Sequence, residues 1–209
     1  QMLDQVLELF KIKPDYDLDV MQPGQDLFDI TANVLLGVKK VLQIEEPDIV
    51  LVHGDTTTSM ATAMAAFYLK IPVGHVEAGL RTHDKWAPFP EEINCQIAGR
   101  VCDYHFAPTT TSQQNLLREN INPNTVLVTG NTVIDALLES VEKVNEQPSA
   151  YIQQLSETIA DKEIILVTGH RRENHGQGFI NICDALKQIA VNNPDIEIIY
   201  PVHLNPNVL

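Results

Sequence analysis

Two patterns of apolar and polar positions alternate along the chain, and each predicts a different element of secondary structure. Short runs rich in Val and Ile predict strands at residues 49–53, 73–77, 104–107, 125–129, 164–168 and 196–203. Longer stretches with apolar residues three or four positions apart predict helices at residues 2–10, 27–44, 59–69, 91–102, 111–119, 133–144, 151–159 and 179–190. The strands lack the in-out alternation of a half-exposed sheet, which favours a parallel sheet covered on both faces. The helix at 59–69 is apolar all round and is therefore expected to be buried.

A polar segment, Glu146-Gln-Pro-Ser149, interrupts this order, and the strand–helix pattern then restarts. We therefore predict an α/β protein with two Rossmann-like domains, one at residues 1–147 and the other at residues 148–209. Gln1 is not an initiator residue, and residues 204–209 stop where a new helix is expected to begin. Both observations lead us to expect a fragment, with a second domain that is only begun.

Composition excludes several classes of partner. The formal net charge is −14, and no basic cluster is longer than Arg171-Arg172, so the chain lacks the basic surface that nucleic acid requires. No apolar run approaches the roughly 20 residues that span a bilayer, so no membrane partner is expected. The three cysteines have no ligand-like spacing and are interpreted as reduced thiols of a cytoplasmic protein.

Carboxylates follow two of the predicted strands, and a third lies at the start of a helix. Asp55 comes after the strand at 49–53, Glu77 ends the strand at 73–77, and Glu91 follows Pro88-Phe-Pro90. Ligands bind at the carboxyl ends of strands in parallel α/β sheets, so the three acids are expected around one crevice, suited to proton transfer. His75 is a further candidate, since it lies two residues before Glu77 on the same side of a strand.

Each of these acids also has a structural interpretation. Asp55 could cap the next helix, although the threonines that follow could cap equally well. Glu77 could form an ion pair with Arg81. Of the two adjacent glutamates, Glu91 and Glu92, one is expected to face the crevice and the other to meet solvent.

A second group of candidates follows the strand at 164–168. His170, Arg171 and Arg172 would suit an anionic group such as a diphosphate, and Glu173 could instead neutralise the arginines. His203, at the end of the last predicted strand, is a further candidate. The sequence has no P-loop and no G-x-G-x-x-G after a strand, so we expect no NAD or ATP cofactor, and no spacing requires a metal.

With these residues identified, the sequence resembles the non-hydrolysing UDP-N-acetylglucosamine 2-epimerases of bacteria. The resemblance is carried, in family order over essentially the whole chain, by His53-Gly-Asp-Thr-Thr-Thr58, Gly74-His-Val-Glu-Ala-Gly-Leu-Arg-Thr82, Pro90-Glu-Glu92, Thr129-Gly-Asn-Thr-Val-Ile-Asp135, Gly169-His-Arg-Arg-Glu-Asn174 and Pro201-Val-His-Leu-Asn-Pro206. It implies a two-domain fold of the glycosyltransferase-B type. It also implies interconversion of UDP-N-acetylglucosamine and UDP-N-acetylmannosamine through a glycal, without a cofactor, by a cytoplasmic homodimer that supplies surface polysaccharide synthesis.

The resemblance also implies roles for particular residues. The family's catalytic acids and bases match Asp55, Glu77, Glu91 and His170, and substrate binding falls to Asp55, Glu77 and His170 together with Arg171 and Arg172. An Arg and a Lys that the family places in the loop after its first strand would lie before Gln1. Most of the uridine-binding half would lie after Leu209. The 209 residues alone are therefore expected to be inactive.

Three other functions remain open at this point. A hydrolysing epimerase of the same architecture would release UDP and free N-acetylmannosamine. A glycosyltransferase of the same fold would need an acceptor and would not exchange the C2 hydrogen with solvent. A sensor of nucleotide sugars would bind without turnover.

Overall fold

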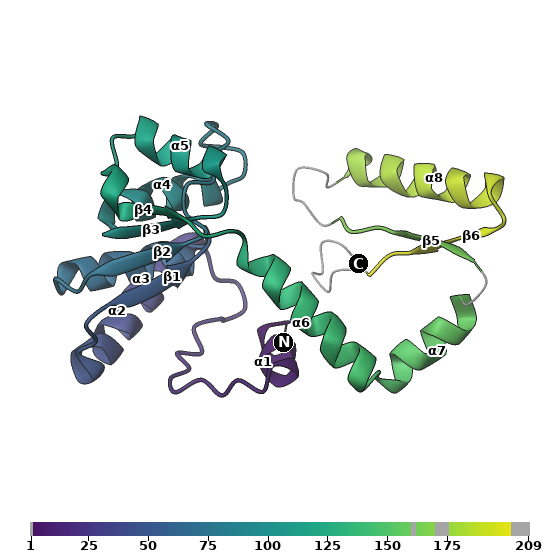
Figure 1. The fold of residues 1–209 in the computed structure, drawn as a ribbon, viewed down its shortest axis with the longest axis horizontal. Coiled ribbons are helices and arrows are strands. Elements are labelled where there is room, and N and C mark those ends of the chain that lie inside the picture. Colours follow the sequence, from purple (N-terminus) through teal and green to yellow (C-terminus); the bar gives the residue numbers. More distant parts are fainter. Residues whose placement is uncertain (1, 160–161, 170–175, 202–209) are drawn as a thin grey trace. The chain divides into compact units, whose positions relative to one another are not determined.

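The structure is a computed structural model that describes residues 2–159, 162–169 and 176–201. The chain divides into two compact units, Gln1–Ser140 and Val141–Leu209 (Figure 1). This division falls within a helix, earlier than the boundary after residue 147 that the sequence suggests. The exact domain boundary stays a prediction.

The order of the elements is the alternating one that the sequence predicts. The first unit contains α1 (Met2–Leu9), α2 (Leu27–Glu45), β1 (Val50–His53), α3 (Thr57–Tyr68), β2 (Val73–Val76), α4 (Glu91–Val101), β3 (Tyr104–Ala107), α5 (Thr110–Arg118), a 3₁₀ turn (Pro123–Thr125) and β4 (Val126–Val128). Helix α6 (Thr132–Glu146) runs across the division, and α7 (Ala150–Ile159), β5 (Glu163–Leu166), α8 (Gln177–Asn192) and β6 (Ile196–Ile199) follow. None of these described helices combines the length and the apolar character needed to cross a bilayer.

Both units contain a parallel sheet, as predicted. The first has the strand order β1-β2-β3-β4, and the second pairs β5 with β6 (Figure 1). In the first unit every pairing is parallel and joins strands that follow each other along the chain. The carboxyl ends of the four strands therefore lie at one edge of the sheet, which is where the predicted site residues were expected.

One face of the four-stranded sheet is buried beneath helices. Val52, His75, His105 and Val126 occupy one line across the four strands, and all four are buried. Helices α3, α4 and α5 contact the sheet, and α2 packs on α3. The opposite face is different, because its residues Leu51, Tyr104 and Leu127 are exposed. The predicted cover on both faces is therefore not seen among the described residues.

Helix α3 is buried over most of its length because its inward positions carry small side chains. Ala61, Ala63, Ala65 and Ala66 are all buried, as the sequence predicts for a helix between two layers. The aromatic residues at its end, Phe67 and Tyr68, are exposed, so the prediction of an all-round buried helix is wrong there. Small residues let α3 lie close to both its neighbours, which fixes the end of β1 that leads into it.

The turn after β2 depends on a close backbone contact with α5. Gly79 has a φ of +86°, in the left-handed region. A Cβ atom at this position would lie 2.3 Å from the backbone oxygen of Ser112. Only glycine fits both the conformation and the space, so the chain turns sharply two residues after Glu77.

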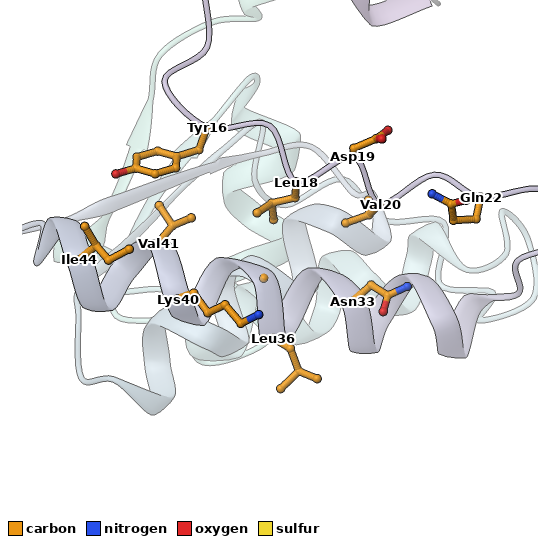
Figure 2. Close-up of a pocket in the computed structure, with 11 residues that line it drawn as sticks. Tyr16, Leu18, Asp19, Val20, Gln22, Asn33, Leu36, Lys40, Val41 and Ile44 are labelled. Carbon is orange, nitrogen blue, oxygen red and sulfur yellow. The ribbon is translucent and has the colours of Figure 1, made fainter.

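A cleft of about 590 Å³ lies along α2, beneath the extended segment that precedes it (Figure 2). The segment is held close because Leu18 packs against Gly37, where a Cβ would lie 2.9 Å from Leu18 Cδ1. The hydroxyl of Tyr16 also donates a hydrogen bond to Glu45 at the end of the helix. None of the predicted site residues lines this cleft. The candidate chemistry lies elsewhere, at the carboxyl edge of the sheet.

The buried imidazole of His75 predicts how stability depends on pH. Burial lowers the pKa of His75 to about 4 from its ordinary 6.5, although a hydrogen bond to the Gly54 carbonyl acts the other way. Between these two values the unfolded chain holds a proton on His75 that the folded chain does not. We therefore expect the free energy of unfolding to fall as the pH drops from 6.5 to 4, by at most about 1.4 kcal/mol per pH unit.

Urea denaturation at a series of pH values measures this slope. The variant His75→Gln should show a flatter dependence than the wild type. The control His83→Gln changes an exposed imidazole but keeps His75, and should retain the slope. Equal slopes in the wild type and His75→Gln would contradict the interpretation.

Candidate active site

The loops after β1 and β2 begin side by side. His53 pairs with Val76 in the sheet, and the Gly54 amide donates to the Val76 carbonyl over 3.0 Å. Below this level the buried imidazole of His75 donates from Nε2 to the Gly54 carbonyl over 2.8 Å. Both strands therefore end at the same height, and the loops that carry Asp55 and Glu77 leave the sheet at neighbouring points.

Asp55 is not the cap of the helix that follows it. That role falls to Thr56, whose side-chain oxygen accepts from the Ser59 amide over 3.2 Å. The Asp55 carbonyl accepts a hydrogen bond from Asn94 Nδ2 over 3.0 Å. Asn94 lies on α4, so this bond fixes the Asp55 loop against a helix that begins far along the chain. The Asp55 carboxylate is left available for other contacts.

Glu77 lies just beyond the end of β2 and has a left-handed backbone, with a φ of 65°. Its Oε2 lies 3.8 Å from His53 Nε2, and its side chain is 25% exposed. A Cβ at Gly54 would lie 3.5 Å from the same oxygen, so the carboxylate sits over the turn after β1. Strand alternation does not extend to Glu77, because the strand has already ended. His75 points into the core rather than along with Glu77, and its role as a site residue stays a prediction.

The alternative pairing of Glu77 with Arg81 is wrong. The Arg81 guanidinium is buried and makes a two-pronged ion pair with Glu119, with Nε–Oε1 and Nη2–Oε2 distances of 2.6 and 2.8 Å. It also contacts Cys95 Sγ at 3.0 Å. Arg81 therefore joins the loop after β2 to α4 and to the end of α5. Within the described residues, Glu77 therefore keeps its contact with His53 and has no ion pair with Arg81.

Glu91 is the first residue of α4 and lies three positions before Asn94, which places the two on one side of the helix. Its Oε2 is shielded from solvent and, within the described part of the chain, has no hydrogen-bond partner. Buried polar atoms are nearly always paired, so this oxygen keeps Glu91 a candidate for contact with a ligand. Glu91 thus faces the same region as the Asp55 loop.

Glu92 does not meet solvent, which corrects the expectation for the second glutamate. It is 3% exposed. Its carboxylate accepts hydrogen bonds from the Thr82 amide and hydroxyl, the His83 amide and Gln96 Nε2, over 2.8 to 3.2 Å. Burial alone would raise the pKa of Glu92, but these hydrogen bonds outweigh burial and lower it. Glu92 therefore anchors the loop that connects Glu77 to Glu91.

The remaining predicted residues lie outside the described residues. These are His170, Arg171, Arg172, Glu173 and His203. Their placement is not described, and their roles stay predictions.

Sequence reasoning assigned no supporting role to three residues that organise this edge of the sheet: His53, Asn94 and Glu92. His53 gave no signal beyond its place in the motif at residues 53–58. Asn94 had a usable signal, because an amide between Ile93 and Ile97 on a packed helix needs a polar partner. Glu92 had none, since acidic residues in a first helical turn are common on the surface.

Comparison with known proteins gives consistent matches over the whole chain. A family model described as UDP-N-acetylglucosamine 2-epimerase matches residues 1–209. The chain is 58% identical to the UDP-N-acetylglucosamine 2-epimerase of Campylobacter jejuni and 57% identical to that of Salmonella typhimurium, over 100% of this chain and 56% of each relative. The chain therefore spans a little over half the length of these curated relatives.

Solved structures agree with these matches. The chain is similar to the UDP-GlcNAc 2-epimerase of Neisseria meningitidis bound to UDP-GlcNAc, with a TM-score of 0.91 and 49% identity over 99% of this chain and 56% of that one. It is also similar to the S. aureus MnaA–UDP co-structure, with a TM-score of 0.89 and 45% identity over 100% of this chain and 53% of that one. These likenesses confirm the predicted fold class, an α/β protein of the glycosyltransferase-B type.

Glu92 gives a testable prediction for the loop between Glu77 and Glu91. In Glu92→Gln an NH₂ group replaces one of the two accepting oxygens and faces donors. We expect a loss of about 1–3 kcal/mol in the free energy of unfolding. Because the pKa of Glu92 is lowered by folding, its stabilisation is present at pH 4.5 and above and is lost as the pH falls further.

Urea denaturation of Glu92→Gln and of the exposed control Glu8→Gln at pH 7 and below 4.5 checks both statements. The difference in the free energy of unfolding between Glu92→Gln and the wild type should be present at pH 7 and become smaller below pH 4.5. A variant as stable as the wild type at pH 7 would show that the four hydrogen bonds do not matter.

Proposed function

The chain belongs to the UDP-N-acetylglucosamine 2-epimerase family, and from this premise we propose that the protein interconverts UDP-N-acetylglucosamine and UDP-N-acetylmannosamine. The observation that carries the proposal is a set of three carboxylates: Asp55 and Glu77, on the loops that leave two adjacent parallel strands, and Glu91, at the start of the helix that is bonded to the Asp55 loop. Inversion at C2 needs a group that removes a proton and another that returns one, and carboxylates serve both purposes. A relative of the same fold bound to UDP-GlcNAc supports the choice of substrate.

The chemistry of the sugar explains why several acids are needed. The C2 proton is not next to a carbonyl carbon, so simple enolate formation is excluded. In the proposed reaction a carboxylate removes the C2 proton, and the electron pair of the C2–H bond forms a double bond between C1 and C2. The C1–O bond breaks at the same time, and its electron pair leaves with the phosphate oxygen of UDP. The product is a glycal. UDP then adds back at C1, and an acid delivers a proton to the other face of C2.

Among the described residues, the three acids have different surroundings. Glu91 has a buried oxygen without a hydrogen-bond partner in the described part of the chain, whereas Glu77 lies beside the His53 imidazole. Asp55 is held by its backbone rather than by its carboxylate. Groups positioned in this way can exchange protons with a sugar, Glu77 from beside an imidazole and Glu91 from a site shielded from solvent. We propose Asp55, Glu77 and Glu91 as the acid–base residues.

The departing diphosphate needs cations to stabilise its charge. Arg81 is committed to Glu119. We propose that His170, Arg171 and Arg172 bind the diphosphate and stabilise it as it leaves, as their sequence context suggests. We propose Glu173 and His203 as further candidates for substrate binding.

The same proposal extends to the location, the oligomeric state and the biological role of the protein. We infer from the family resemblance that the protein is a cytoplasmic homodimer. We also infer that its product supplies surface polysaccharide synthesis. Neither inference depends on the arrangement of the carboxylates.

Exchange of hydrogen with solvent tests the reaction. In D₂O, the intact protein should convert UDP-N-acetylglucosamine into a mixture of both epimers that carry deuterium at C2, because proton removal and return pass through groups that exchange with water. Mass spectrometry and proton NMR measure the label. Free N-acetylmannosamine would instead indicate a hydrolysing epimerase. Transfer to an acceptor without C2 labelling would indicate a glycosyltransferase.

Removal of single carboxylates tests the assignment of the site. In the intact protein, Asp55→Asn, Glu77→Gln and Glu91→Gln should each lower kcat by about 10²–10⁴-fold while UDP still binds, because each removes a proton-transfer group rather than a phosphate contact. The matched control is Asp48→Asn, an exposed aspartate before the opposite end of β1. Wild-type turnover in any of the three variants would remove that residue from the mechanism.

A further inference from the structure

His53 is placed to contact two loops at once. It is the last residue of β1, and its side chain is 61% exposed. Its Nε2 lies 3.8 Å from Glu77 Oε2 and 3.2 Å from Thr132 Oγ1. Glu77 follows β2, and Thr132 is the first residue of α6, after β4. A single imidazole therefore connects the loops that leave β1, β2 and β4.

The backbone of His53 is fixed on both sides, so the point from which its side chain leaves the sheet is fixed. It pairs with Val76 in the sheet, and its carbonyl accepts a hydrogen bond from the Ser59 hydroxyl. The next residue, Gly54, has a left-handed φ of 72° and is held through its carbonyl by His75. These contacts hold the backbone of His53 in place while its side chain extends toward the crevice.

The Glu77 carboxylate lies beside the imidazole of His53. Within residues 2–159, 162–169 and 176–201, the basic side chain in ion-pair range of Glu77 is His53. Arg81, four residues further along, is turned toward Glu119 instead. The left-handed backbone of Glu77 orients its side chain over Gly54, beside the imidazole.

We propose that His53 is a positioning residue for Glu77: its imidazole holds the Glu77 carboxylate at the crevice and is itself oriented by the Thr132 hydroxyl. The inference rests on the proposed function and adds a residue that acts through Glu77 rather than on the sugar. Thr132 suits this task because a hydroxyl can donate to a neutral ring nitrogen or accept from a protonated one. The Nε2 atom can thus keep contact with Thr132 in either protonation state of the ring.

Three substitutions at position 53 separate positioning from simple packing. His53→Leu removes the polar contact, whereas His53→Gln keeps an N–H donor near the place of Nε2. In the intact protein, His53→Leu should lower kcat by about 10- to 100-fold with unchanged KM and UDP affinity, since a misplaced proton-transfer group costs rate rather than binding. His53→Gln should recover most of the rate. Added imidazole should partly rescue His53→Ala, because the ring site is open to solvent.

A second measurement reads the contact without any turnover. The ¹⁵N shift of His53 Nε2 should change in Glu77→Gln and in Thr132→Val, but not in the control Asp48→Asn. If the wild type incorporates no deuterium at C2 of the sugar, the proposed function is wrong. The NMR comparison still tests whether His53 contacts Glu77.

Three results would overturn the role of His53. The first is wild-type kcat in His53→Leu. The second is a loss of kcat that is equal in His53→Leu and His53→Gln and that parallels a fall in the Tm of both variants. The third is a ¹⁵N chemical shift of His53 Nε2 that is the same in the wild type and in Glu77→Gln.

Discussion

The parallel pairing of β1 with β2 is the constraint on which the candidate site depends. His53 opposite Val76, with the Gly54 amide bonded to the Val76 carbonyl, ends both strands at one level. Residues that follow the two strands must then emerge together. A shift of one residue in this register would turn His75 out of the core, which its burial makes costly, so packing and the site are determined by the same pairing.

Buried polar side chains around this edge bind backbone and other side chains rather than facing the crevice. They hold the loops in place, and the less buried carboxylates are left to face a ligand. Such bonds stabilise most when every donor and acceptor is satisfied, which holds for the Glu92 carboxylate and its four donors. The side chains that do this supporting work are His75, Arg81, Glu92 and Asn94.

Much of this arrangement could be predicted from the sequence, because apolar periodicity and strand-end chemistry are local signals. The βα order, the parallel sheet and the gathering of the Asp55 and Glu77 loops all follow from them. The pairing of Arg81 with Glu119 could not, since nothing local distinguishes it from a bond to Glu77. The left-handed backbone of Glu77 is equally invisible, because a glutamate carries no local signal for this conformation. The length of β2 was overestimated by one residue for that reason.

The tight turn at Gly79 has a consequence for anyone who maps this site by saturation mutagenesis. Even alanine would collide there with the Ser112 carbonyl and would be strained at a left-handed φ, so intolerance at codon 79 would reflect local shape rather than chemistry. The position stands two residues from a candidate acid and would look catalytic in a survival screen. Abundance of the folded variant, scored in parallel with growth, would tell an essential shape from an essential reaction.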